Sequence, residues 1–170
     1  MKNKQDLKYL AICEDMLKLS DCSLIHFACA LINENTGQVY AYGINSAQGK
    51  CRDGCLKDKI KDRTIGKNPS LCHAYHAEWV ALGLALIDYS SVEGATLYIV
   101  GKYPDGSFYK NKNFACTVCA RLLTLFGVAR IKGPQFSDNP SIEDLTGYEE
   151  VTMSAAYASA YKDLIGKLTG

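Results

Sequence analysis

The sequence predicts an α/β fold in which helices pack on a central mixed β-sheet. Short apolar stretches with strand character alternate along the chain with longer stretches whose apolar residues recur at helical spacing. Strand pairs that are separated by helices imply a mixed sheet with helices packed on it. A chain of 170 residues is long enough for one domain with a large core, so we expect residues 1–170 to form a single domain.

The first part of the chain is expected to supply a helix and a hairpin. Residues 6–19 carry apolar side chains along one face of a helix. Residues 24–32 and 38–44 have strand character, and residues 33–37 between them (Asn-Glu-Asn-Thr-Gly) are typical of a hairpin turn. Residues 49–70 are rich in charge and lack a clear period, so we expect a long loop or a short, irregular helix there.

The second part alternates helices with strands. Its first helix is broadly apolar and is therefore expected to be buried, and a later helix is ended by Gly127. The expected elements are a helix at 76–89, a strand at 95–100, a helix at 116–126, a strand at 128–132, a turn-rich connection at 133–139 and a C-terminal helix at 154–168.

Charge and cysteine content narrow the function classes. The 19 basic and 18 acidic side chains nearly balance, which argues against general nucleic-acid binding. The basic residues between 57 and 67 are interleaved with acidic ones and are interpreted as a solvated face. The polar N-terminus and the shortness of the apolar runs predict a cytoplasmic protein without a membrane span. In that compartment the eight cysteines are expected to be metal ligands or core residues rather than disulfides.

Two short motifs, 40 residues apart, point to a metal centre. His76-Ala77-Glu78 begins one apolar helix, and Cys116-Thr117-Val118-Cys119 begins another. Cys116 and Cys119 are three residues apart, so both thiolates lie on one face of a helix and can reach one ion. A catalytic zinc takes three protein ligands and keeps a fourth position open, and Glu78 remains as a carboxylate for proton transfer. The alternatives are a closed site with His73 or Cys72 as fourth ligand, or plain core thiols.

Together these motifs resemble those of the cytidine and deoxycytidylate deaminase superfamily. The deoxycytidylate (dCMP) deaminase branch is the most similar, because residues 51–72 resemble its cysteine-bearing insertion and Gly43-Ile44-Asn45 resembles its sugar-contacting segment. The resemblance covers residues 22–133 and implies a three-layer cytidine-deaminase-like fold. It departs at Ala115, where the family usually has Pro, and in the long loop at 101–113.

The resemblance implies a zinc-dependent hydrolytic deaminase of a cytosine mononucleotide, most simply dCMP to dUMP with release of ammonia. His76, Cys116 and Cys119 would hold Zn²⁺ and Glu78 would move the protons, while Asn45, Ala77 and Arg52 would contact the substrate. A deaminase of another base or nucleoside (guanine, cytidine or a modified pyrimidine) stays open because of the long loop. A non-catalytic zinc-stabilised scaffold is the third hypothesis, and the presence of Glu78 speaks against it. The family also implies a small-molecule substrate and a homo-oligomer.

Further residues have two interpretations each. A second, structural zinc is implied by the dCMP branch, with ligands drawn from Cys22, Cys51, Cys55, Cys72 and His73. The aromatic residues of the long loop (Tyr103, Phe108 and Tyr109) are either stacking walls for a base or loop packing. Trp79, next to Glu78, is expected to be a core residue.

Overall fold

The computed structural model describes residues 4–51, 53–55, 72, 74–109, 115–134 and 148–169. The strands are β1 (His26–Asn33), β2 (Gln38–Ile44), β3 (Thr96–Lys102), β4 (Arg130–Pro134) and β5 (Tyr148–Thr152). The helices are α1 (Lys4–Met16), which continues into a 3-10 turn η1 (Leu17–Leu19), α4 (Ala77–Asp88), α5 (Thr117–Leu125) and α6 (Met153–Thr169). None of the described helices is long and apolar enough to cross a membrane.

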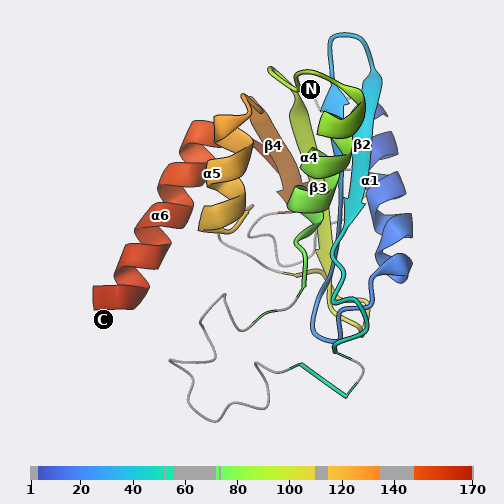
Figure 1. The fold of residues 1–170 in the computed structure, drawn as a ribbon, viewed down its shortest axis with the longest axis vertical. Coiled ribbons are helices and arrows are strands. Elements are labelled where there is room, and N and C mark those ends of the chain that lie inside the picture. The colour runs from blue at the N-terminus through green and yellow to red at the C-terminus, as the bar shows by residue number, and fades with distance from the viewer. Residues whose placement is uncertain are drawn as a thin grey trace.

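The strands form one mixed sheet in the order β2-β1-β3-β4-β5. Strand β1 is antiparallel to β2 and β3, β4 is antiparallel to β5, and β3 and β4 are parallel. Helix α5 provides the crossover between the two parallel strands, as the geometry of a βαβ unit requires. Figure 1 shows α1 on one side of the sheet and α4, α5 and α6 on the other. The predicted α/β class with helices on a mixed sheet is confirmed.

Each face of the central strands packs into its own core. In β1, Ala30 and Ile32 face α1, whereas Cys29 and Leu31 face α4, and all four are fully buried. This alternation follows from the two-residue period of a strand, and burial on both faces explains why β1 is a nearly continuous apolar run. The larger core, on the side of α4, α5 and α6, lies directly behind the two sequence motifs.

Three differences from the sequence-based expectations have simple causes. Strand β5 was not predicted, because its five residues (Tyr-Glu-Glu-Val-Thr) form an edge strand whose charged side chains hide the apolar period. The strand expected at 128–132 lies two residues later, and it continues into the segment expected to be a turn. The first helix ends at Met16 as an α-helix. Most of the segment at 49–70 lies outside the described residues.

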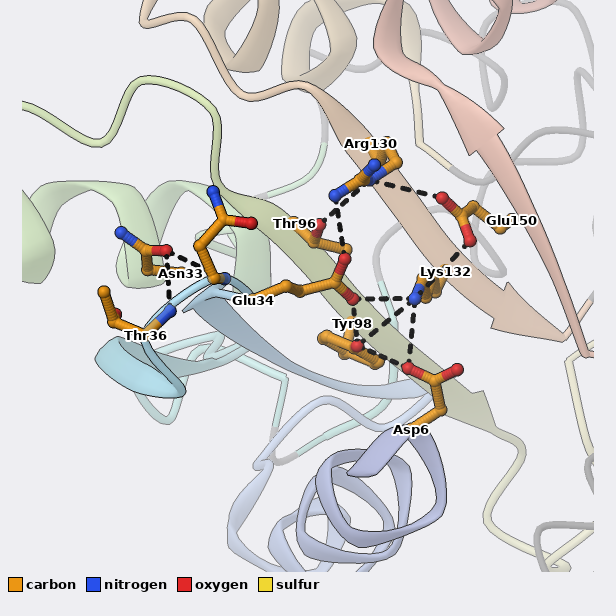
Figure 2. Close-up of polar contacts among 10 residues, drawn as sticks. Asp6, Asn33, Glu34, Thr36, Thr96, Tyr98, Arg130, Lys132 and Glu150 are labelled. Carbon is orange, nitrogen blue, oxygen red and sulfur yellow. Dashed lines mark hydrogen bonds and ion pairs between the residues drawn. The ribbon is translucent and has the colours of Figure 1, made fainter. Parts of the chain in front are cut away.

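A cluster of charged side chains fastens five elements together on the α1 side of the sheet (Figure 2). Lys132 lies at its centre, 13% exposed, with Nζ 2.7 Å from Glu34 and 3.0 Å from Asp6. Arg130 contacts Glu34 at 2.9 Å and Glu150 at 3.2 Å, and the Tyr98 hydroxyl lies within hydrogen-bond distance of the carboxylates of Asp6 and Glu34. The Lys132 cluster therefore joins the start of α1 and the β1–β2 turn to strands β3, β4 and β5.

The pKa shifts in the Lys132 cluster indicate that the folded state favours the charged forms of Glu34 and Lys132. Burial opposes the ionisation of Glu34, but the Lys132 ammonium and the Tyr98 hydroxyl outweigh it, so the pKa of Glu34 is lowered. Burial lowers the pKa of Lys132, but the carboxylates of Glu34 and Asp6 outweigh this effect, so its pKa is raised. A lowered carboxyl pKa means that Glu34 stabilises the folded state fully above its unfolded pKa and that this contribution is lost at lower pH.

We predict that Glu34→Gln lowers the free energy of unfolding at pH 7 by about 1–3 kcal/mol, because it leaves Lys132 and Arg130 without a shared carboxylate. The deficit should shrink as the pH falls below about 4.3, the unfolded pKa of a glutamate, and through the lowered folded value. Urea unfolding at pH 7 and pH 3 measures this, with Glu93→Gln, an exposed carboxylate outside the cluster, as the control. An equal deficit at both pH values would contradict the role of the Glu34 charge.

Candidate metal centre and active-site pocket

The two sequence motifs meet where helices α4 and α5 begin. His76 is the N-cap residue of α4 and Cys116 is the N-cap residue of α5, and both have an extended backbone. The Cys116 sulfur accepts a hydrogen bond from the backbone N–H of Cys119 at 3.4 Å, which is the usual contact of an N-cap side chain. The helix starts thus turn all three ligand side chains toward one point.

The three ligand atoms lie close together, at separations equal to or slightly shorter than those of a zinc site. Nδ1 of His76 lies 3.2 Å from the Cys119 sulfur and 3.6 Å from the Cys116 sulfur, and the two sulfurs are 3.2 Å apart. Tetrahedral zinc with its usual bond lengths separates such atoms by about 3.5–3.8 Å. Among the described residues, these three are the one group of three or more candidate ligands within 4.8 Å of one another. Two sulfurs and one nitrogen fit Zn²⁺ and leave a fourth position open.

The electrostatics of the cysteine pair favour the thiolate form of one of its two members, Cys116. The Cys119 thiol stabilises the Cys116 thiolate against the opposing effect of burial, and together with His76 it lowers the pKa of Cys116 to about 4. The Cys116 thiolate and burial raise the pKa of Cys119 in turn. Because zinc binds thiolates, the pair already holds one of the two charges that the ion requires.

Glu78 lies beside the ligands without belonging to their group. It is the second residue of α4, it is 6% exposed, and its side chain lines a cavity together with His76 and Cys116. Burial raises the pKa of Glu78, and the nearby His76 partly offsets that effect. A buried carboxyl group with a raised pKa next to an open metal position is suited to accept and return protons.

The cavity beside the metal centre has a volume of about 220 Å³ and mostly uncharged walls. Apart from His76, Glu78 and Cys116, the wall is made of apolar side chains together with the uncharged polar groups of Asn45, Tyr109 and the other cysteines. The described residues that line the cavity are Cys22, Leu24, Ile25, Phe27, Asn45, Cys72, Ala74, His76, Ala77, Glu78, Tyr109, Ala115 and Cys116. The predicted substrate contacts Asn45 and Ala77 are both among them.

Two aromatic rings form a wall of this cavity. Phe27 meets Tyr109 edge to face, with ring centroids 5.2 Å apart. Residues 101–109 fold back on themselves, because Tyr103 N donates to Ser107 O at 2.8 Å and Tyr109 N donates to Gly101 O at 2.9 Å. Of the three loop aromatics singled out in the sequence, Tyr109 reaches the cavity. The Phe108 ring lies 4.3 Å from the Lys102 ammonium and packs against the α1-side core.

Phe27 and Gly101 were not singled out from the sequence, although they shape the cavity. The two residues pair across β1 and β3, and a Cβ at Gly101 would lie 2.7 Å from Cδ1 of Phe27. The missing side chain at Gly101 therefore provides the space in which the Phe27 ring lies. A glycine at the end of a predicted strand is a sequence signal of such close approach.

Asn45 is held by the fold before it meets any substrate. Its side-chain oxygen accepts from Phe27 N at 2.8 Å and from the Ser20 hydroxyl at 2.6 Å. Its side-chain nitrogen donates to Ile25 O at 2.8 Å. Because its side-chain oxygen faces Phe27 N and the Ser20 hydroxyl and one N–H is bonded to Ile25 O, Asn45 has one N–H donor left for the cavity.

The structure describes four of the five residues that were predicted to bind a second zinc. Cys22, Cys51 and Cys55 are buried and Cys72 is half-buried. Burial raises the pKa of Cys51, and Cys22, Cys55 and Cys72 are close enough to raise it further. In the described part of the chain they do not form a group at metal-ligand spacing, and Cys72 does not join the first three ligands. His73 and Arg52 lie outside the described residues, so the second zinc stays a prediction.

Comparison with known proteins identifies the family. A family model for the cytidine and deoxycytidylate deaminase zinc-binding region matches residues 3–133. The chain belongs to this family. Its members' zinc chemistry agrees with the ligand geometry, so the protein is a zinc-binding deaminase, a hydrolase that acts on a C–N bond of nucleotides or nucleosides. Among curated proteins, none matches the chain significantly.

Solved structures share the fold of this deaminase at low sequence identity. The dCMP deaminase of cyanophage S-TIM5 in its apo form has a TM-score of 0.53 and 18% identity, covering 86% of this chain and 95% of that one. The same enzyme in complex with dCMP and dUMP has a TM-score of 0.55 and 19% identity, covering 85% and 91%. Cytidine deaminase from Mycobacterium leprae has a TM-score of 0.50 and 16% identity, covering 91% and 97%.

We predict that Gly43→Ala disturbs the metal centre, because Gly43 in β2 contacts the start of α4, which carries His76 and Glu78. A Cβ at Gly43 would overlap Ala77 O and lie 2.6 Å from Ala81 N, so the first turn of α4 would have to move. We expect a loss of about 1–3 kcal/mol in stability and weaker zinc retention against a chelator. The matched control is Gly83→Ala on the same helix, where an added Cβ meets nothing within 4 Å. Normal zinc retention in Gly43→Ala would contradict this account.

Proposed function

We propose that this deaminase converts a cytosine mononucleotide, most simply dCMP, to the uracil nucleotide with release of ammonia. The observation that carries the proposal is the open three-ligand centre with Glu78 facing the same cavity. The fold shared with a phage enzyme solved in complex with dCMP and dUMP supports this substrate class.

The protein's own side chains divide the work. Bound zinc supplies a Lewis acid that lowers the pKa of a water to about 7. His76, Cys116 and Cys119 hold the ion, and Glu78 accepts the proton that the water loses as its oxygen forms a bond to the ring carbon bearing the amine. Glu78 then delivers protons to the ring nitrogen and to the departing ammonia, so that water and the amine are exchanged for a carbonyl and ammonia.

The cavity offers contacts for the base and the sugar of a nucleotide. The flat walls formed by Phe27 and Tyr109 suit a planar base. Ala77 opens α4, where backbone N–H groups have no partner within the helix, so its N–H can donate to a base carbonyl. The remaining N–H of Asn45 can donate to a sugar hydroxyl.

We assign the phosphate to Arg52. Among the described residues that line the cavity there is no Lys or Arg, so the cation must come from elsewhere. Arg52 follows the buried Cys51, which lies near Cys22 in the cavity wall. Charge-assisted bonds from one guanidinium to a phosphate are worth about 1.5–3 kcal/mol.

A second candidate function is deamination of an uncharged substrate, such as a nucleoside or a free base. The uncharged character of the described cavity walls favours it, as does Tyr109, which the folded 101–109 segment brings into the cavity. The non-catalytic scaffold is disfavoured because a buried Glu78 beside an open ligand position costs stability and has no role in a scaffold.

We also propose a cytoplasmic homo-oligomer. All eight cysteines are free thiols, as expected in a reducing compartment. Exposed apolar side chains near the ends of α4 and α5 support self-association, because such groups on a soluble protein mark an interaction surface. They are Leu84 (48% exposed), Ile87 (76%), Leu125 (75%) and Phe126 (39%).

We predict that Glu78→Gln keeps zinc and the fold but lowers turnover by at least about 10⁴-fold. A single general acid–base group contributes about 10²–10⁴-fold, and Glu78 serves several proton transfers in one cycle. Steady-state ammonia release, together with zinc content by elemental analysis, measures both properties. Near-normal turnover in a variant that retains its zinc would reject the proton-transfer role.

We predict that dCMP is used at least about tenfold more efficiently than deoxycytidine, because the phosphate adds one ion pair. Side-by-side kcat/KM values for dCMP, CMP, deoxycytidine, cytidine, cytosine and guanine measure the preference. Arg52→Ala should remove most of it, whereas Lys8→Ala, an exposed cation on α1, should not. If deoxycytidine or a free base is used as well as dCMP, the nucleotide assignment fails. If dCMP wins and Arg52→Ala has no effect, the phosphate contact lies elsewhere.

A further inference from the structure

The only tryptophan of the chain lies against the histidine ligand. The Trp79 and His76 rings are stacked, with centroids 5.2 Å apart and planes 19° from parallel. Trp79 is in the first turn of α4, and its backbone N–H donates to His76 O at 3.1 Å. The sequence predicted a core residue at this position, and the indole does pack against the larger core, but one face is turned to the ligand.

The imidazole of His76 is therefore bounded on two sides. Nδ1 faces the sulfurs of Cys116 and Cys119, and the indole covers a face of the ring. The ring plane of a histidine ligand must be fixed if the nitrogen lone pair is to point at the metal.

We propose that Trp79 is a positioning residue for the metal centre: by stacking, it holds the His76 imidazole in the plane in which Nδ1 faces the two cysteine sulfurs. The buried indole N–H has no hydrogen-bond partner among the described residues, so the flat face of the ring makes the contribution. The proposal rests on the zinc site and not on dCMP as the substrate, so it stands or falls separately from the nucleotide assignment.

The position of Trp79 also makes it a reporter of the metal. Its fluorescence emission should change as zinc binds to His76, because the imidazole stacked on the indole then becomes a metal ligand. Metal-free wild-type protein titrated with ZnCl₂ should show a change in emission that is complete when the His76 site is filled. This measurement needs no substitution, and emission that is insensitive to a zinc ion shown by elemental analysis to be bound through His76 would contradict the close contact.

Variants separate positioning from general packing. Trp79→Ala should bind zinc about 10- to 100-fold more weakly in competition with a chromophoric chelator, as is usual when a residue that orients a ligand is removed. Trp79→Phe keeps an aromatic face and should restore affinity to within about threefold of wild type. The matched control is Leu82→Ala, which removes a side chain from the same helix and the same core.

The control distinguishes the proposal from a core role. Leu82→Ala should lose stability, measured on the metal-free proteins, while it keeps its zinc affinity. Wild-type zinc affinity in Trp79→Ala would overturn the proposal. So would an equal loss of affinity in Leu82→Ala, or a Trp79→Phe variant that binds zinc as weakly as Trp79→Ala.

Discussion

The backbone of α4 touches strand β2 at Gly43, and the position of the metal centre depends on that contact. With no Cβ at Gly43, the carbonyl of Ala77 and the N–H of Ala81 can lie directly on the strand. The start of α4, and with it His76 and Glu78, is thereby fixed at the end of the sheet where β2 and β3 finish. Helix α5 begins beside the same cavity and brings Cys116 and Cys119 to meet them.

The chemistry of the site follows from two helix starts that share one cavity. The positive end of each helix dipole favours anions, which suits the Cys116 thiolate at the start of α5 and the carboxylate of Glu78 at the start of α4. Burial acts against the charge of Glu78 and keeps it ready to hold a proton. Two further side chains at the site, Asn45 and Trp79, are held in place by hydrogen bonding and by stacking within the fold.

Features encoded by local spacing could be predicted from the sequence, and features made by distant contacts could not. The ligand set followed from the three-residue spacing of Cys116 and Cys119 and from two helix-opening motifs, and the bounds of β2 agree with the expected 38–44. The Lys132 cluster joins residues as far apart as Asp6 and Lys132, and no sequence period records such a pair. Asn45 was expected at the site, but its bonds to Ser20 and Phe27 depend on tertiary structure.

The central claim is that three side chains from two helix starts hold one zinc ion. Elemental analysis of zinc per chain in purified wild type, Cys116→Ser, Cys119→Ser and Cys13→Ala tests it most directly. Cys13 is buried against the other face of the sheet and serves as the control. We expect at least one tightly held zinc in wild type and Cys13→Ala, and one zinc fewer in each serine variant, because a hydroxyl is a poor substitute for a thiolate. Full zinc content in both serine variants would contradict the claim.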